Sequence, residues 1–269
     1  MTHTFTLYPA LTELKMLTAR KLNAMKFMQA FHRSAIKQQS SSEIALVDTK
    51  RDHLCRIQTQ TVKQEAMDDY QELCKLYIPK ISKQQELPMK HLSSFKTTFG
   101  DQNNCTHMWK YEGKSYSAHG EVEKQMRSVP EFIKFREERA KMIKSSRDEL
   151  LFEFGFWPEM VGDLSDDKIY ELRRYNLQPG TLLQWASEWN VVMKNKVRSD
   201  QPVGGFYTDI GQLFTVYHLW AYENLEDRVQ KRNMAWNKEG DDWQKVVANT
   251  QVLCTKMESS ILEVIKMSE

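Results

Sequence analysis

One short string of residues occurs twice in this chain of 269 residues, and it restricts the possible folds more than any other feature. Residues 107–112 read His-Met-Trp-Lys-Tyr-Glu, and residues 218–223, which lie 111 positions later, read His-Leu-Trp-Ala-Tyr-Glu. Further residues match at this offset or, upstream of the string, at an offset of 115: Phe95 with Phe206, Gly100 with Gly211, Ile57 with Leu172, and Tyr70 with Trp185. Such internal similarity indicates a duplicated domain, so we expect the function to depend on the two copies together.

The composition narrows the class of protein. With 41% hydrophobic and 28% charged residues, the chain is typical of a soluble globular protein, and no apolar run reaches the roughly 18 residues of a membrane-spanning helix. Beyond residue 42 the chain has 32 basic and 35 acidic residues, so it lacks the basic surface that nucleic-acid binding requires. The four cysteines form no C-x-x-C pair, which favours buried free thiols in a reducing compartment: Cys55, Cys74, Cys105 and Cys254.

The first 45 residues differ from the rest and are predicted to be a mitochondrial transit peptide or disordered leader. Residues 1–42 contain six basic residues and one acidic residue, Glu13. Apolar side chains recur between the bases at helical steps: Leu7, Leu11, Leu14, Leu22, Met25, Met28 and Phe31. This pattern of an amphipathic cationic helix is typical of mitochondrial targeting. The alternative is an N-terminal helix docked on the body, with the polar run at 38–42 as a linker.

Alternation and helical periodicity predict the same order of elements in both copies. For residues 50–160 we expect strands at 54–62, 90–99, 104–112 and 149–157, with helices at 64–83, 122–127 and 130–144. For residues 165–269 we expect strands at 168–177, 202–209, 213–221 and 259–265, with helices beginning at 179–181 and at 225–236 and 242–249. Pro79 is expected to kink or end the first helix. The order β-α-β-β-α-β predicts an α+β fold of two tandem ferredoxin-like repeats.

A set of motifs resembles the NIPSNAP family over about residues 52–269. In the second copy these motifs are Ile169–Arg173, Leu177–Gly180, Val203–Phe206, Gly211–Leu213, His218–Tyr222, Arg228, Arg232–Asn233 and Ala235–Trp236. In the first copy they are His107–Trp109, Phe135–Arg139 and Leu150–Phe154 with Phe156–Trp157. The first copy departs from the pattern in its opening strand, because Leu54–Ile57 lacks the aromatic-Glu-Leu-Arg sequence of the second.

The resemblance implies a fold, a location and partners. The fold is the dimeric α/β-barrel version of the ferredoxin-like unit, with both halves supplied by one chain. The location is mitochondrial, in the matrix with display on the outer surface of damaged mitochondria. Members bind autophagy receptors and ubiquitin-like autophagy modifiers, and they associate with themselves and with each other. The resemblance therefore predicts a non-enzymatic adaptor in mitochondrial quality control, or mitophagy.

The repeated histidines and tryptophans are the first candidate ligand site. Alternation along the strand places His218 and Trp220 on one face of the sheet, and His107 and Trp109 occupy the corresponding positions of the first copy. If this face lines the barrel, these side chains border a cavity for a small molecule or haem, since neutral imidazole is a good ligand. The alternative function is then a small-molecule or haem-binding barrel, with a cofactor-poor monooxygenase as one form of it. Otherwise each histidine is a hydrogen-bonded core residue and each tryptophan fills space.

Charged residues on the first strand of the second copy form another candidate. Alternation points Glu171, Arg173 and Tyr175 towards one face. At a barrel mouth, Arg173 could bind an anion. The alternative is a structural ion pair between Glu171 and Arg173 near a subunit interface.

A third candidate is a docking string for autophagy modifiers. The sequence Asp241-Asp242-Trp243-Gln244-Lys245-Val246 has the acidic-aromatic-x-x-aliphatic pattern that adds a strand to a partner's sheet edge. Residues 68–73 match more weakly. Because both strings fall in predicted helices, an aromatic and an aliphatic residue three apart also fit a buried helical stripe. The common hydrolase, P-loop, zincin and dinucleotide motifs are missing from the sequence, and we predict no catalytic residues, metal or cofactor.

Overall fold

The computed structural model describes residues 54–83, 87–112, 115–162, 164–195, 201–238 and 240–267. All of them belong to one compact unit, Leu46–Glu269. The predicted leader, residues 1–45, lies outside the described residues. Within the described ranges, no helix combines the length and the apolar character needed to cross a membrane.

The chain forms the α+β order that the sequence predicts. The first half, residues 54–153, contains β1 (Leu54–Val62), the short 3-10 helix η1 (Gln64–Ala66), α3 (Met67–Ser82), β2 (Met89–Phe99), β3 (Asn104–Tyr111), α4 (Ser115–Met126), α5 (Pro130–Met142) and β4 (Ile143–Glu153). The second half, residues 169–264, contains β5 (Ile169–Leu177), α6 (Leu182–Asn195), β6 (Gln201–Ile210), β7 (Thr215–Tyr222), α7 (Leu225–Lys238), α8 (Gly240–Gln251) and β8 (Cys254–Val264).

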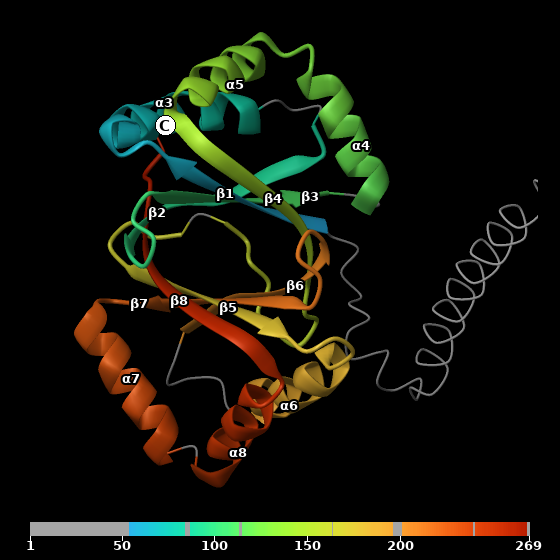
Figure 1. Cartoon of the computed structure of the whole chain (residues 1–269), viewed down its shortest axis with the longest axis vertical. Coiled ribbons are helices and arrows are strands. Elements are labelled where there is room, and N and C mark those ends of the chain that lie inside the picture. Colours follow the sequence, from blue (N-terminus) through green and yellow to red (C-terminus); the bar gives the residue numbers. More distant parts are fainter. Residues whose placement is uncertain are drawn as a thin grey trace, which may run out of the picture. The chain divides into compact units, whose positions relative to one another are not determined.

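The strands form one closed antiparallel barrel (Figure 1) in the order β1-β3-β2-β8-β5-β7-β6-β4. Each half contributes four neighbouring strands, and two pairings join the halves. One is β2 with β8, where Phe95 lies opposite Val264, and the other is β4 with β6, where Glu153 lies opposite Phe206. Closure leaves no strand edge exposed among these strands, so the backbone hydrogen bonds of the sheet are used within the chain.

The sheet is covered on both faces. Side chains from both halves fill the barrel interior, among them Ile57, Phe95, Met108, Tyr170, Phe206 and Leu219. Figure 1 shows α3, α4 and α5 over the outer face of the first half and α6, α7 and α8 over that of the second. Two separate apolar cores lie under these helix layers. Consequently every residue of β7 is buried, whichever way its side chain points.

Several predicted boundaries are wrong, and each error has a physical reason. Strand β4 begins at Ile143 rather than 149, and β8 begins at Cys254 rather than 259. The first residues of both strands are mostly exposed and are held by backbone pairing with β1 and β5, so they lack the apolar alternation of a buried strand. The end of the first helix, by contrast, lies close to its predicted bound: α3 runs to Ser82, three residues beyond Pro79, so the proline does not end it.

Candidate functional site

The repeated strings lie on the outer face of the barrel, under the helices. In each string, the residue between the histidine and the tryptophan points into the barrel: Met108 and Leu219 belong to the interior core. Trp109 and Trp220 point the other way and pack in the two helix-covered cores. Alternation thus correctly placed His218 and Trp220 on one face. The condition for a ligand site inside the barrel is not met, because Trp109 and Trp220 lie in the helix-covered cores. Both faces of these strands are buried, so periodicity alone does not show which one lines the interior.

His107 is a hydrogen-bonded core residue of the first half. Its Nε2 lies 2.8 Å from the Tyr70 hydroxyl on α3, and its Nδ1 lies 2.6 Å from the Ser94 hydroxyl on β2. Burial, with the nearby cationic groups of His91, Arg139 and Arg56, lowers the pKa of His107 to about 3. The imidazole is therefore neutral, and both of its nitrogens are used in the fold.

His218 has a different environment. Its ring stacks on Trp157 with centroids 4.1 Å apart and lies 4.9 Å from Trp185 and 4.7 Å from Trp189. Neither ring nitrogen has a hydrogen-bond partner among the described residues. Burial and the guanidinium of Arg173 hold the pKa of His218 well below its usual value. Because the ring is fully enclosed, His218 cannot ligate a haem iron without displacement of the aromatic side chains.

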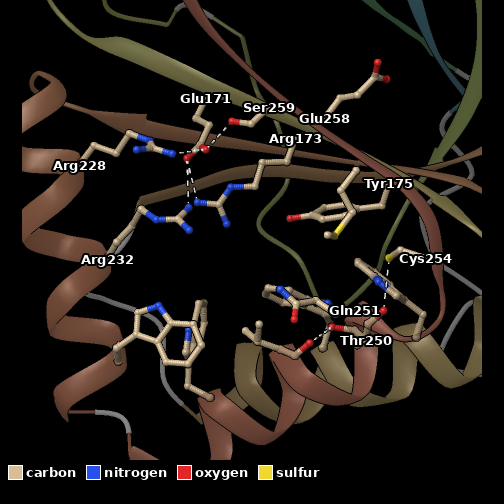
Figure 2. A pocket seen from close by; sticks show the side chains of 16 residues that line it. Glu171, Arg173, Tyr175, Arg228, Arg232, Thr250, Gln251, Cys254, Glu258 and Ser259 are labelled. Atoms are coloured by element: carbon tan, nitrogen blue, oxygen red, sulfur yellow. Dashed lines mark hydrogen bonds and ion pairs between the residues drawn. The ribbon is translucent and has the colours of Figure 1, made fainter. Parts of the chain in front are cut away.

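A cavity of about 300 Å³ lies beside this aromatic cluster, outside the barrel (Figure 2). Strands β5 and β8 form one wall, and helices α6, α7 and α8 supply the others. The cavity is lined by Glu171, Arg173, Tyr175, Trp185, Trp189, Arg228, Arg232, Trp236, Trp243, Val247, Thr250, Gln251, Cys254, Met257, Glu258 and Ser259. Trp185 and Trp189 thus separate His218 from the cavity.

The charged end of the cavity is organised around Glu171, which is 1% exposed. Arg228 donates to Oε1 of Glu171 at 2.7 Å, Arg173 donates to Oε2 at 2.8 Å, and the Ser259 hydroxyl donates to Oε1 at 2.6 Å. Arg232 makes an ion pair with Oε2 at 3.7 Å. Burial alone would raise the pKa of Glu171, but hydrogen bonds from Arg228 and Arg173 outweigh it and hold this pKa well below the usual value.

The arginines of this end exceed their counter-ion. Arg173, Arg228 and Arg232 face one carboxylate, Glu171, while Glu258 forms ion pairs with Arg174 and Lys256 instead. The Nε atoms of Arg173 and Arg228 have no hydrogen-bond partner in the described part of the chain. Burial and the cations of Arg173 and Arg228 lower the pKa of Arg232 from its ordinary value. This end of the cavity therefore attracts negative charge.

The other end of the cavity is aromatic and apolar. Trp185 and Trp189 lie with ring centroids 5.5 Å apart, and Trp243 meets Trp189 edge-on at 5.6 Å. In Figure 2 the Thr250 and Cys254 side chains close this end, with the Cys254 thiol 3.3 Å from the Thr250 carbonyl oxygen. Burial raises the pKa of Cys254 to about 11, so the thiol is protonated and not nucleophilic at neutral pH.

The structure brings together some of the predicted residues and separates others. Glu171 and Arg173 share the cavity and also form the expected ion pair. His107 and Trp109 lie in the other half. Trp243 and Val246 are 8% and 5% exposed on α8. This arrangement fits the buried helical stripe that the sequence offered as the alternative to a docking strand. The side chains of Asp241 and Asp242 lie outside the described residues.

Sequence reasoning missed Arg228 and Arg232 as site residues. They lie four apart on α7 and reach the same carboxylate. Residues four apart on a helix lie on the same face, so the spacing of Arg228 and Arg232 in a predicted helix could have indicated a shared site. What the sequence did not contain was the position of that face above Glu171.

The fold and cavity define the chain as an antiparallel α+β barrel protein with a ligand-sized pocket under the helices of its second half. A family model described as NIPSNAP matches residues 170–269. The human Protein NipSnap homolog 2 is 38% identical over 223 residues, which cover 83% of this chain and 77% of that protein. The Drosophila melanogaster Protein NipSnap is 30% identical over 207 residues, covering 77% and 74%. The chain therefore belongs to the NIPSNAP family.

Solved structures with little sequence similarity share the fold. A putative monooxygenase from Lactobacillus acidophilus aligns with a TM-score of 0.56 at 9% identity, covering 80% of this chain and 94% of that chain. A putative monooxygenase from Fusobacterium nucleatum gives a TM-score of 0.57 at 10% identity, covering 80% and 93%. At such identities the likeness concerns the α+β architecture and carries no information on chemistry.

Proposed function

We propose that this NIPSNAP protein binds a small molecule in the cavity on the outer face of its second half. The observation that carries the proposal is a cavity of about 300 Å³ with a polar end built around Glu171 and an aromatic end. Ligand sites span roughly 300–1,000 Å³ and combine mostly apolar walls with a few convergent polar groups. The cavity has this composition at the lower end of that size range.

The unpaired donors of the cavity support ligand binding over a purely structural role. The buried Nε atom of Arg173 has no partner within the described chain. Leaving a buried donor without a partner costs about 1–3 kcal/mol, more for a charged group. A ligand that accepts a hydrogen bond from Arg173 would remove this cost. The sequence-level alternative of a small-molecule-binding barrel is thus kept, with its site moved from the interior to the helix-covered face.

A fragment-binding experiment tests this function. Ligand-observed NMR with aromatic fragments of positive, neutral and negative charge is expected to identify binders of the full chain. Val247→Trp places a large side chain in the cavity and should abolish this binding. Val191→Trp, on the exposed side of α6, is the matched control and should bind as the parent does. Binding that persists in Val247→Trp would exclude the cavity as the site.

The two halves are proposed to be tandem repeats that arose by duplication and correspond to the two subunits of a dimeric α/β barrel. Support comes from the repeated string and from the pairing register, since Gln58 lies opposite His107 where Arg173 lies opposite His218. Association with further copies or with other family members remains an expectation. Sedimentation of the purified chain would test it, and a monomer at micromolar concentration would contradict it.

A second proposed function rests on membership of the family. We propose a role as a mitochondrial adaptor that binds autophagy receptors and ubiquitin-like modifiers. Import of a reporter fused to residues 1–45 into mitochondria is expected, with loss of import when Arg20, Lys21 and Lys26 become Glu. Capture of an immobilised autophagy modifier by the purified chain is also expected. Failure of capture with a folded protein would contradict direct adaptor binding.

A further inference from the structure

We propose that the ligand of the cavity is a small aromatic carboxylate, with its carboxylate held by Arg232 and the free edges of Arg173 and Arg228. This inference rests on the proposed ligand binding and adds the chemical class of the ligand. Figure 2 shows the three arginine side chains converging on the charged end of the cavity. The aromatic side chains lie at the other end, so the two chemical requirements are met at opposite ends of one space.

The charge balance of the site requires an anion. Within the described ranges, three guanidinium groups face the carboxylate of Glu171, so the positive charge at this end exceeds the negative charge by two. Arg173 is 8% exposed, and unpaired charge is costly at such burial. Glu171 stays ionised beside the incoming anion, because its pKa is held well below the usual value. One added negative charge lowers this imbalance.

The donor geometry favours a planar carboxylate. Arg173 and Arg228 each use an Nη2 atom to bind Glu171 and keep an Nε donor without a partner in the described chain. Among the described residues Arg232 has one ion pair, at 3.7 Å, which leaves most of its planar fork of donors available there. Guanidinium forks match carboxylates through two parallel hydrogen bonds. A carboxylate can therefore bind Arg232 in this way and accept a further hydrogen bond from a neighbouring Nε.

The body of the ligand should be flat and aromatic. The faces of Trp185 and Trp189 are tilted by 30° to each other, and the edge of Trp243 closes the space beside them. Offset and edge-to-face packing on such walls adds about 0.5–1.5 kcal/mol to the effect of burial alone. With a volume of about 300 Å³, the cavity suits one or two fused rings rather than a long chain.

The test compares 2-naphthoate with 2-naphthamide, which has the same rings and no charge. Quenching of tryptophan fluorescence should give naphthoate an affinity about tenfold or more above that of the amide, as expected for charge-assisted hydrogen bonds. Arg232→Gln should weaken naphthoate by about the same factor and leave the amide unchanged. Arg136→Gln, an exposed arginine on α5, is the control with the same charge change and should have no effect.

A second variant and one competing anion keep the outcomes of the test distinct. Arg232→Lys retains the charge but not the fork, so naphthoate affinity should fall between those of the parent and Arg232→Gln. Circular dichroism of each variant should match the parent, since the Arg232 side chain is 37% exposed. Equal binding of amide and naphthoate, or equal displacement by inorganic phosphate, would overturn the carboxylate assignment while leaving ligand binding intact. If neither naphthalene compound binds, but other fragments bind the parent and not Val247→Trp, the ligand is not an aromatic carboxylate. If no fragment binds at all, the proposed ligand binding fails as well.

Discussion

The two halves place the same His-x-Trp-x-Tyr string under their helices but surround it with opposite charges. On β1, Arg56 lies opposite Trp109, and on β5 the residue opposite Trp220 is Glu171. Arg56 is an arginine with two carboxylate partners, Asp148 at 2.6 Å and Glu123 at 3.3 Å. Glu171 is instead a carboxylate among three arginines. The same backbone position thus changes the sign of its charge between the halves.

The histidines of the two strings also differ in what holds them, His107 by hydrogen bonds and His218 by ring packing. Tyr70 on α3 hydrogen-bonds His107, whereas the residue that matches Tyr70 by sequence offset is Trp185, which packs against His218 through its ring. In the first half, the polar groups next to the histidine therefore bond each other. In the second half, the Nε atoms of Arg173 and Arg228 have no hydrogen-bond partner among the described residues, and both side chains line the cavity. This difference supports the placement of the proposed binding site in the second half.

The largest expected effect comes from removing the central charge of each half. Glu171→Gln leaves the buried Arg173 without a counter-ion and should reduce the free energy of unfolding by about 3–5 kcal/mol. Arg56→Gln removes two ion pairs whose side chains are 21–42% exposed, so about 1 kcal/mol is expected. Urea unfolding at pH 7 measures both. Equal losses would remove the contrast between the halves.

Acid should destabilise the protein through its buried histidines. In the unfolded chain histidine takes up a proton below about pH 6.5, whereas folded His107 stays neutral to about pH 3. Between these values the unfolded state binds more protons, so the free energy of unfolding falls as the pH falls. For His107 alone the loss from pH 6.5 to 4 is about 3 kcal/mol at most. Unfolding curves across this range should show that slope, and His107→Phe should reduce it. An unchanged slope in the variant would contradict a neutral, buried His107.

A matched pair of substitutions separates the roles of the two histidines at neutral pH. His107→Phe leaves the Tyr70 and Ser94 hydroxyls without this partner and should destabilise the fold by about 2 kcal/mol. His218→Phe breaks no hydrogen bond within the described chain and puts an aromatic ring among aromatic rings, so less than about 1 kcal/mol is expected. Thermal unfolding at pH 7.5 distinguishes them. A larger loss for His218→Phe would contradict an imidazole held by ring packing alone.

Much of the fold follows from the sequence because the pattern is written twice. Alternation in each copy gave the α+β order, and matching glycines marked the hairpin turns before β3 and β7. The site was only partly predictable. Alternation showed that Glu171, Arg173 and Tyr175 share a face, and all three line the cavity. It did not show which face lies under the helices, because both faces of β5 carry a mixture of apolar and charged residues.

The remaining part of the site depends on contacts between elements distant in sequence. Arg228 reaches Glu171 across 57 residues, and Ser259 reaches it across 88. No local pattern encodes such distances. The buried position of Trp243 was likewise undecided at the level of sequence, since an acidic-aromatic string and an amphipathic helix have the same spacing. Packing of α8 against Trp189 decides it in favour of the helix.

The smallest expected difference concerns the two turn glycines. Gly100 and Gly211 have φ angles of 116° and 126°, so alanine is strained at both positions by a similar amount. A Cβ atom at Gly100 would lie 2.6 Å from the Ser260 hydroxyl, which can rotate away, whereas at Gly211 it would lie 2.6 Å from Cγ of Glu149. That carboxylate accepts hydrogen bonds from the Gln212 amide and the Tyr217 hydroxyl and cannot easily move. Gly211→Ala should therefore cost about 1 kcal/mol more than Gly100→Ala. Parallel urea titrations measure the difference, and identical midpoints would mean that Glu149 is free to move and that this junction of the halves is less rigid than its contacts imply.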